Sequence, residues 1–148
     1  SCIMEQLNLP AHDFKIKHDG KKTQIFDSIR KKFVTLTPEE WVRQNFIQYL
    51  IKVKNYPASL IAVEKEIQLG ELKKRFDILV YDADHRPWMM IECKAGEVKM
   101  DESVLQQALR YNMSVPVQFI VITNGSLSYA WEKKNSGLDD ISELPVLK

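Results

Sequence analysis

The chain has 148 residues, 45% of them hydrophobic and 28% charged, which predicts one globular domain over residues 1–148 with a buried core. It has no run of about 18 apolar residues and no signal-like start, so we expect no membrane partner. Its two cysteines, Cys2 and Cys93, do not suggest a disulfide framework, which fits a cytoplasmic protein. The net charge of +1 counts against a tight nonspecific DNA binder, because such proteins are usually more basic.

The first half of the chain predicts one strong helix. Residues 1–24 are polar and predict no regular element, and residues 26–34 fit either a short helix or a short strand. The stretch Thr37-Pro38-Glu39-Glu40 begins a helix, because threonine is a good N-cap, proline fits the first turn, and Glu40 completes a capping box. The helix is expected to end near Lys54. Its apolar face consists of Val42, Phe46, Tyr49, Leu50 and Val53.

The second half alternates between strands and one more helix. Asp101 caps a helix over about residues 102–112, and Asn124-Gly125 is a hairpin-turn signal. Residues 137–148 are expected to be peripheral, like residues 1–24, which leaves a core over about residues 30–131. The order α-β-β-β-α-β-β predicts a three-layer α/β fold with a mixed β-sheet and helices on both faces. The expected strands cover residues 60–69, 75–81, 88–94, 117–123 and 127–131.

The strands on either side of the turn at residues 82–87 carry charged residues inside apolar runs. If Asp77 faces Glu92, paired residue numbers sum to 169 and the chain reverses between Asp84 and His85, in the middle of this turn. Side chains alternate along a strand, so Asp77, Glu92 and Lys94 share one face. That face also carries Leu79, Tyr81 and Met90. The opposite face carries Phe76, Ile78, Val80, Met89, Ile91 and Cys93.

Two neighbouring carboxylates and a lysine predict a site for metal-dependent phosphodiester hydrolysis. The carboxylates repel each other, and a divalent cation removes that cost. Mg²⁺ binds one or two carboxylates and keeps waters for itself and a substrate phosphate. Lys94 is close enough to contact the same phosphate or the attacking water. The alternative interpretation is a buried ion cluster of Asp77, Glu92 and Lys94 that has no chemistry.

Several stretches resemble the PD-(D/E)xK nuclease superfamily, and the likeness is closest to the N-terminal nuclease domain of type I restriction enzyme R subunits and its free-standing relatives. The superfamily motif has a proline where this chain has Phe76, which is a minor departure. The likeness spans about residues 30–131. It is carried by Leu36-Thr37-Pro38-Glu39-Glu40-Trp41-Val42-Arg43-Gln44, Lys74-Arg75-Phe76-Asp77-Ile78, Ile91-Glu92-Cys93-Lys94-Ala95, Gln107-Ala108-Leu109-Arg110-Tyr111-Asn112 and Thr123-Asn124-Gly125.

This resemblance implies a restriction-endonuclease-like fold and assigns roles to individual residues. Asp77 and Glu92 would bind Mg²⁺, or Mn²⁺ as a substitute, with the backbone carbonyl of Cys93 as a further ligand. Lys94 would serve the attacking water. Gln107 and Tyr111 would support the site as a Gln-x-x-x-Tyr element, and they share one helix face because they are four residues apart. An ordinary polar helix edge explains this last pair equally well.

Two further sets of residues are candidates for the site. Members of this group often add a glutamate from the first helix. Glu39 lies in phase with the face toward the sheet, whereas Glu40 is explained by capping, and Arg43 can pair with either. The run Lys73-Lys74-Arg75 precedes Asp77 and is either a phosphate-contacting segment or a solvated strand entrance.

The sequence therefore supports three functional hypotheses. The first is a Mg²⁺-dependent deoxyribonuclease in a restriction or defence context, with DNA as its partner. The second is a nuclease-fold module that binds nucleic acid or a partner restriction subunit without cutting. The third is a homodimeric scaffold within a restriction assembly. The chain lacks a Gly-x-x-x-x-Gly-Lys-[Ser/Thr] phosphate loop, so any helicase motor would lie on a separate subunit.

Overall fold

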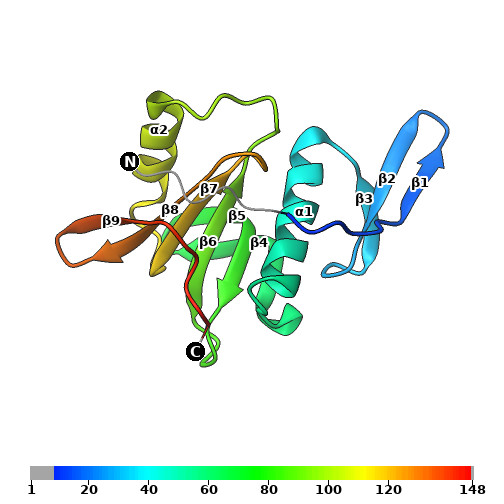
Figure 1. Cartoon of the computed structure of the whole chain (residues 1–148). Coiled ribbons are helices and arrows are strands. Elements are labelled where there is room, and N and C mark those ends of the chain that lie inside the picture. The colour runs from blue at the N-terminus through cyan, green and yellow to red at the C-terminus, as the bar shows by residue number, and fades with distance from the viewer. Residues whose placement is uncertain (1–8, 148) are drawn as a thin grey trace.

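The computed structural model describes residues 9–147, in which two helices cover opposite faces of a six-stranded mixed sheet and a three-stranded sheet lies beside the first helix (Figure 1). The large sheet has its strands in chain order, β4-β5-β6-β7-β8-β9. This confirms a mixed α/β fold with helices on both faces. Within the described residues, no helix is long and apolar enough to cross a membrane.

The small sheet was not expected from the sequence. Its strands are β1 (Ile16–Asp19), β2 (Lys22–Asp27) and β3 (Lys32–Thr35), joined as antiparallel hairpins. The prediction of no regular element before residue 24 is therefore wrong for part of that segment. The hairpin turn at Gly20, with a φ of 62°, is the local reason that a polar segment can fold back. The undecided segment at residues 26–34 is a strand, a turn and a strand.

Helix α1 (Pro38–Lys52) begins as predicted, with the Thr37 hydroxyl accepting a hydrogen bond from the Glu40 amide. The full capping box is not formed, because the Glu40 carboxylate instead contacts three side chains of a buried network described below. The helix ends two residues earlier than expected, and Val53 is 48% exposed rather than part of the buried face. The 3-10 helix η1 (Ala58–Leu60) then leads into the large sheet.

The large sheet contains the three consecutive strands predicted from the sequence. They are β4 (Ile61–Leu69), β5 (Leu72–Tyr81) and β6 (Pro87–Cys93), paired antiparallel. Helix α2 (Glu102–Asn112), capped by Asp101 as expected, carries the chain across to a parallel pairing with β6. The remaining strands are β7 (Phe119–Thr123), β8 (Ser128–Lys134) and β9 (Gly137–Ile141).

Two apolar clusters hold the helices to the sheet. The α1 side includes Phe46 and Leu50 of the helix and Ile78, Val80 and Ile91 of the hairpin, all fully buried. The α2 side joins Leu105 and Ala108 to another set of strand residues: Phe76, Leu79, Met90, Ile120 and Ile122. The central hairpin is therefore covered on both faces, which explains its apolar character.

The alternation of faces along β5 differs from the prediction at one point. Phe76 packs on the α2 side with Leu79, although strict alternation would place it with Ile78. Glu64, which lies opposite Asp77 between the pairs Val63–Ile78 and Lys65–Phe76, has a φ of 54°. A positive φ interrupts regular strand geometry, so this irregularity lies beside the predicted acid.

The tail is part of the fold rather than peripheral. Strand β9 pairs with β8, which overturns the expectation for residues 137–148 as far as they are described. Leu144 is 2% exposed in the α1-side cluster, and the Pro145 carbonyl accepts a hydrogen bond from the Tyr56 hydroxyl at 2.5 Å. The short apolar segment at residues 144–147 lacks a period long enough to reveal this packing.

Replacing Leu144 with alanine is expected to lower the free energy of unfolding by about 2–4 kcal/mol, because it leaves a cavity in the α1-side core. Urea denaturation monitored by tryptophan fluorescence measures the change. The matched control is Val146→Ala, whose side chain is 73% exposed and should alter stability by less than about 0.5 kcal/mol. Equal stability of both variants would show that the tail does not contribute to the core.

Candidate metal centre and its charged network

The predicted acids and lysine line one cavity at the end of the central hairpin. The pairs Ile78–Ile91 and Leu79–Met90 give the predicted register sum of 169, so Asp77 and Glu92 are brought to the same end. The cavity measures about 510 Å³. Its walls come from α1, β5, β6 and α2, and include Glu39, Asp77, Glu92, Lys94, Gln107 and Tyr111.

Asp77 is held from two sides. One carboxylate oxygen accepts a hydrogen bond from the Cys93 amide at 2.7 Å, and the other lies 2.9 Å from the Arg43 guanidinium. Burial raises the pKa of Asp77 above its ordinary value, the Cys93 amide and Arg43 oppose that rise, and the nearby Glu92 adds to it. The side chain is still 19% exposed, so it is accessible from the cavity.

Glu92 and Lys94 form an ion pair within the cavity. The Lys94 ammonium lies 3.0 Å from one Glu92 carboxylate oxygen, and the two side chains are 34% and 21% exposed. The other Glu92 oxygen accepts a hydrogen bond from the Asn112 amide at 3.3 Å. The Lys94 backbone amide donates to the Thr123 carbonyl, so the end of β6 stays anchored to β7 beyond its last ladder pair. Both ionic groups are therefore positioned by neighbouring elements.

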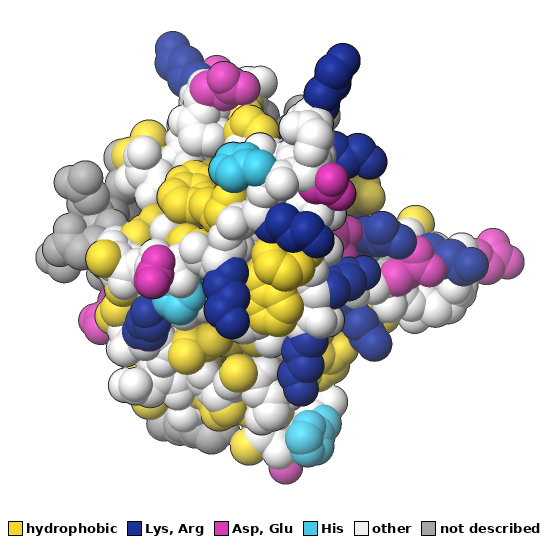
Figure 2. All heavy atoms as spheres, turned by 90° about the vertical axis from the view of Figure 1, so that its right-hand side faces the viewer, with side chains coloured by type: hydrophobic (Ala, Val, Ile, Leu, Met, Phe, Trp, Pro, Cys, Tyr) yellow, Lys and Arg dark blue, Asp and Glu magenta, His cyan; other side chains and the backbone are white. Residues whose placement is uncertain are grey.

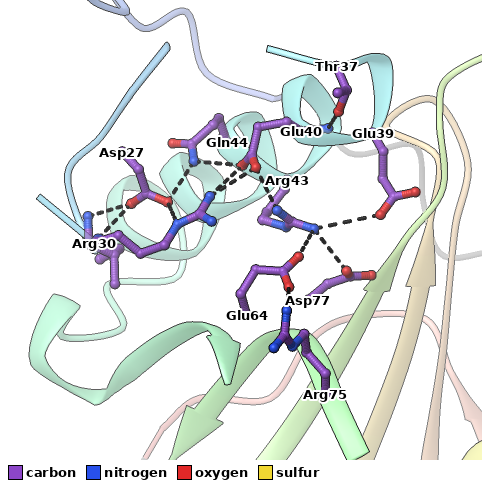
Figure 3. A network of polar contacts seen from close by, with 11 residues as sticks. Asp27, Arg30, Thr37, Glu39, Glu40, Arg43, Gln44, Glu64, Arg75 and Asp77 are labelled. Atoms are coloured by element: carbon purple, nitrogen blue, oxygen red, sulfur yellow. Dashed lines mark hydrogen bonds and ion pairs between the residues drawn. The ribbon is translucent and has the colours of Figure 1, made fainter. Parts of the chain in front are cut away.

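Arg43 lies at the centre of the carboxylates from α1, β4 and β5 (Figure 3). Its guanidinium is 2.6 Å from Glu40, 2.6 Å from Glu64, 2.9 Å from Asp77 and 3.6 Å from Glu39. The side chain is only 5% exposed. Burial works against its charge, but the surrounding carboxylates raise the pKa of Arg43, so it remains a fixed cation. One atom, Nε, is buried with no hydrogen-bond partner in the described structure.

The network extends from Glu40 into the small sheet. Arg30 donates to both oxygens of Glu40 and also pairs with Asp27 at 2.6 Å. Gln44 donates to Asp27 and to Glu40. Burial alone would raise the pKa of Asp27, but hydrogen bonds from the Arg30 backbone and side chain and from Gln44 outweigh it and hold the pKa below its ordinary value. The turn between β2 and β3 is thus tied to the base of the site.

The two first-helix glutamates have different surroundings. Glu39 lines the cavity and is half exposed, whereas Glu40 is buried in the Arg30–Arg43 network. Burial raises the pKa of Glu39, and Asp77 and Glu64 raise it further against the opposing effects of Arg43 and Lys94. The position of Glu39 is the one that the helix phase predicted.

The basic run before Asp77 divides into three environments. Arg75 is 63% exposed and lines the cavity, and Lys73 is exposed outside it. Lys74 is buried. Its ammonium donates a hydrogen bond to the Tyr111 carbonyl and lies 3.8 Å from the centre of the Tyr111 ring. Burial lowers the pKa of Lys74. Its amine is directed into the protein, so the expectation of a phosphate contact does not fit this residue.

Sequence reasoning missed Glu64, Asn112 and the Asp27–Arg30 pair. Glu64 lies in a strand with an ordinary alternating pattern. The only sequence signal for its role was an acidic side chain at the position that lies opposite Asp77 when the two strands pair antiparallel. Asn112 looked like the last residue of an amphipathic helix. Asp27 and Arg30 lie in residues 26–34, whose secondary structure the sequence left undecided. The sequence therefore did not predict their contacts with the first helix.

The donor set fits a hard divalent cation. Asp77 and Glu92 supply carboxylate oxygens at one cavity, and Mg²⁺ needs one or two such groups together with waters. Among residues 9–147, no group of three or more His, Cys, Asp and Glu side chains already stands in a metal-binding arrangement. A Mg²⁺ site made of two carboxylates, a backbone oxygen and waters does not require such a group. Burial is the largest cause of the raised pKa values of Asp77 and Glu39, and neighbouring carboxylates add to both, so a bound cation would favour the ionised forms of these acids.

This fold and cavity define an α/β domain with an acidic and lysine-bearing site at the end of a central hairpin. The chain belongs to the family described as type I restriction enzyme R protein N terminus (HSDR_N), which matches residues 38–145. The match begins at the first residue of α1 and includes every residue that lines the cavity. The resemblance found in the sequence is thereby confirmed at the level of the family. No curated protein matches the chain.

Replacing Asp27 with asparagine is expected to destabilise the protein by about 1–3 kcal/mol at pH 7, because its charged partner Arg30 loses a buried acceptor. Since the pKa of Asp27 is depressed on folding, its contribution is present above pH 3.8 and is lost as the pH falls through the lower folded value. The difference between wild type and variant in urea denaturation should therefore shrink below pH 3.8. The exposed Asp139→Asn is the control. A difference independent of pH would contradict the role of the Asp27 charge.

Proposed function

We propose that this domain is a Mg²⁺-dependent deoxyribonuclease that hydrolyses phosphodiester bonds in a restriction or defence context. The observation that carries the proposal is the convergence of Asp77, Glu92 and Lys94 on one cavity. Two acids and an amine at the end of a buried hairpin are costly unless they are paired or used. Membership of the restriction R protein N-terminal family supports a nuclease-related use.

Asp77 and Glu92 would hold the cation, with the Cys93 carbonyl as a further oxygen ligand. When bound, the cation would supply positive charge that polarises a phosphoryl oxygen and lowers the pKa of a nearby water. The thiol of Cys93 packs in the α1-side core, and burial raises its pKa well above the ordinary value. Cys93 would thus contribute through its backbone, because its side chain is buried and protonated.

Lys94 would position the water or contact the transferred phosphate. Its side chain is one-third exposed, and its ammonium pairs with Glu92 at the cavity wall. A cation at that position stabilises negative charge as it develops on phosphate oxygens, and its N–H groups donate to a water. Arg75, exposed at the cavity edge, would bind a neighbouring DNA phosphate, with Lys73 further along the same strand.

Arg43 would act as a positioning residue for Asp77. Its guanidinium donates a hydrogen bond to one carboxylate oxygen of Asp77, and the Cys93 amide donates to the other. These two hydrogen bonds fix the rotation of the carboxylate. Gln107 and Tyr111 line the opposite wall from α2 and would contact DNA or order water. Tyr111 is 64% exposed, so its ring is available to a ligand on the side away from Lys74.

A second candidate function is a nuclease-fold module that binds DNA or a partner restriction subunit without cutting. One observation favours it: both Asp77 oxygens already have partners inside the protein, Arg43 and the Cys93 amide. An arrangement that serves only stability would satisfy the acids in this way. A homodimer, or assembly with a separate helicase or modification subunit, fits either function.

Asp77→Asn and Lys94→Ala are each expected to reduce DNA cleavage by at least about 100-fold, because one loses a metal ligand and the other a cation at the reacting phosphate. Nicking of supercoiled plasmid in 10 mM Mg²⁺, with EDTA as the blank, gives the rate. Circular dichroism checks that each variant is folded.

Lys52→Ala, an exposed lysine at the end of α1, is the control and should cleave like wild type. Loss of cleavage only in the two site variants supports the nuclease. Absence of Mg²⁺-dependent cleavage by wild type, across linear, supercoiled and single-stranded DNA, would contradict it and leave the binding module.

Metal binding can be measured without activity. A saturable site should raise the melting temperature of wild type by about 2–5 °C when Mg²⁺ or Mn²⁺ is tenfold above its dissociation constant. Glu92→Gln should abolish the shift because it removes a charged ligand. Asp84→Asn, in the exposed β5–β6 turn, should keep it. An equal shift in all three proteins would indicate only a general ionic effect.

A further inference from the structure

Positive charge is concentrated in the small sheet. Residues 9–36 contain seven lysines and arginines against three aspartates, whereas residues 37–148 contain 14 basic and 16 acidic residues. Asp27 is buried and paired with Arg30, so this pair adds no net charge, and six lysines remain against two aspartates. The near-neutral charge of the whole chain therefore conceals a basic region outside the segment that matches the family.

The outward face of the small sheet combines lysines with aromatic rings. The register pairs Phe26 with Phe33, and the Phe26 amide donates to the Lys15 carbonyl, which places alternate residues of all three strands on one face. The two rings meet edge to face with centroids 5.3 Å apart. The Lys15 ammonium lies 5.7 Å from the Phe26 ring, and that of Lys17 lies 5.2 Å from the Phe33 ring.

This face is open to solvent. Lys15 and Lys17 are exposed, Phe33 is 36% exposed, and Phe26 is half-buried. Figure 2, which faces this side of the molecule, shows hydrophobic side chains with lysine and arginine side chains around them. The opposite face of the sheet carries the fully buried Ile25 and Asp27, which tie it to the protein. The aromatic pair is therefore on the side that the fold leaves uncovered.

We propose that this face of β1–β3, defined by Lys15, Lys17, Phe26 and Phe33, binds single-stranded nucleic acid. Lysines on a strand two residues apart are about 7 Å from each other, a separation that neighbouring phosphates of an extended strand can match. Exposed rings offer stacking to unpaired bases, which a duplex would keep inside its own stack. The cation–π contacts are weak at an exposed site, so a phosphate and a base can replace them.

This binding does not depend on the nuclease activity proposed above. It uses residues from a different sheet and requires no metal. The two are mechanically connected, because Arg30 follows β2 and contacts Glu40, which in turn contacts Arg43 beside Asp77. A strand bound on the small sheet would thus be held by an element that hydrogen bonds connect to the cavity.

The test is fluorescence anisotropy of a labelled 20-nucleotide oligo(dT) with the full chain in EDTA, so that cleavage is absent. Lys15→Gln/Lys17→Gln should weaken binding by at least about tenfold. It should also reduce the slope of log K against log [salt] by about 1.4, for two lost phosphate contacts at about 0.7 each. Phe33→Ala should weaken binding by about 5-fold to 100-fold without changing that slope.

The matched control is Arg86→Gln/Lys134→Gln, which removes the same charge from the exposed β5–β6 turn and the end of β8. It should bind within about twofold of wild type. Equal losses in both double variants, or no loss in either, would overturn the proposal. A duplex bound as tightly as oligo(dT), with no effect of Phe33→Ala, would overturn the stacking role. Asp77→Asn should keep oligo(dT) binding even if it abolishes cleavage, which separates the two proposals.

Discussion

The buried guanidinium of Arg43 is the constraint on which the site depends. Four carboxylates from α1, β4 and β5 approach it within 2.6–3.6 Å, although the side chain is almost inaccessible to water. Without this cation the acids would repel one another in a poorly solvated region, and the hairpin would lose the partner that fixes Asp77. Because Glu40 connects Arg43 to Arg30, the same interaction also joins the small sheet to the large one.

The cavity combines this internal neutralisation with acidic side chains that remain accessible from it. Arg43 satisfies Glu40 and Glu64 closely, while Asp77 and Glu39 keep raised pKa values and face the cavity with Glu92 and Lys94. In the proposed function, a cation would enter this partly compensated arrangement with its own waters. The positive φ of Glu64, next to Asp77 in the neighbouring strand, places backbone strain beside this position.

Charge is distributed unevenly between the two sheets. The large sheet and its helices are slightly acidic, and the family match covers them, whereas the basic small sheet precedes the match. If the domain bound nucleic acid at the cavity alone, its slightly acidic large sheet and helices would exert little long-range electrostatic attraction on a polyanion. The basic face of β1–β3 would supply that attraction.

The sequence by itself determined the central hairpin, its register as far as Val80, both helix starts and the family, whereas the shift that pairs Tyr81 with Pro87 differs from the predicted register. These features follow from local rules: alternation fixes which residues pair, and capping residues fix where a helix begins. Only the tertiary structure decided the small sheet, the place of residues 137–147 and the partners of Arg43. Asp27, Arg30 and Glu64 reach the network of Arg43 from β2, the β2–β3 turn and β4, and neither the short polar hairpin nor the alternation of β4 indicates these contacts. Long-range ion pairs leave no local pattern, because each partner looks like an ordinary surface charge until the chain is folded.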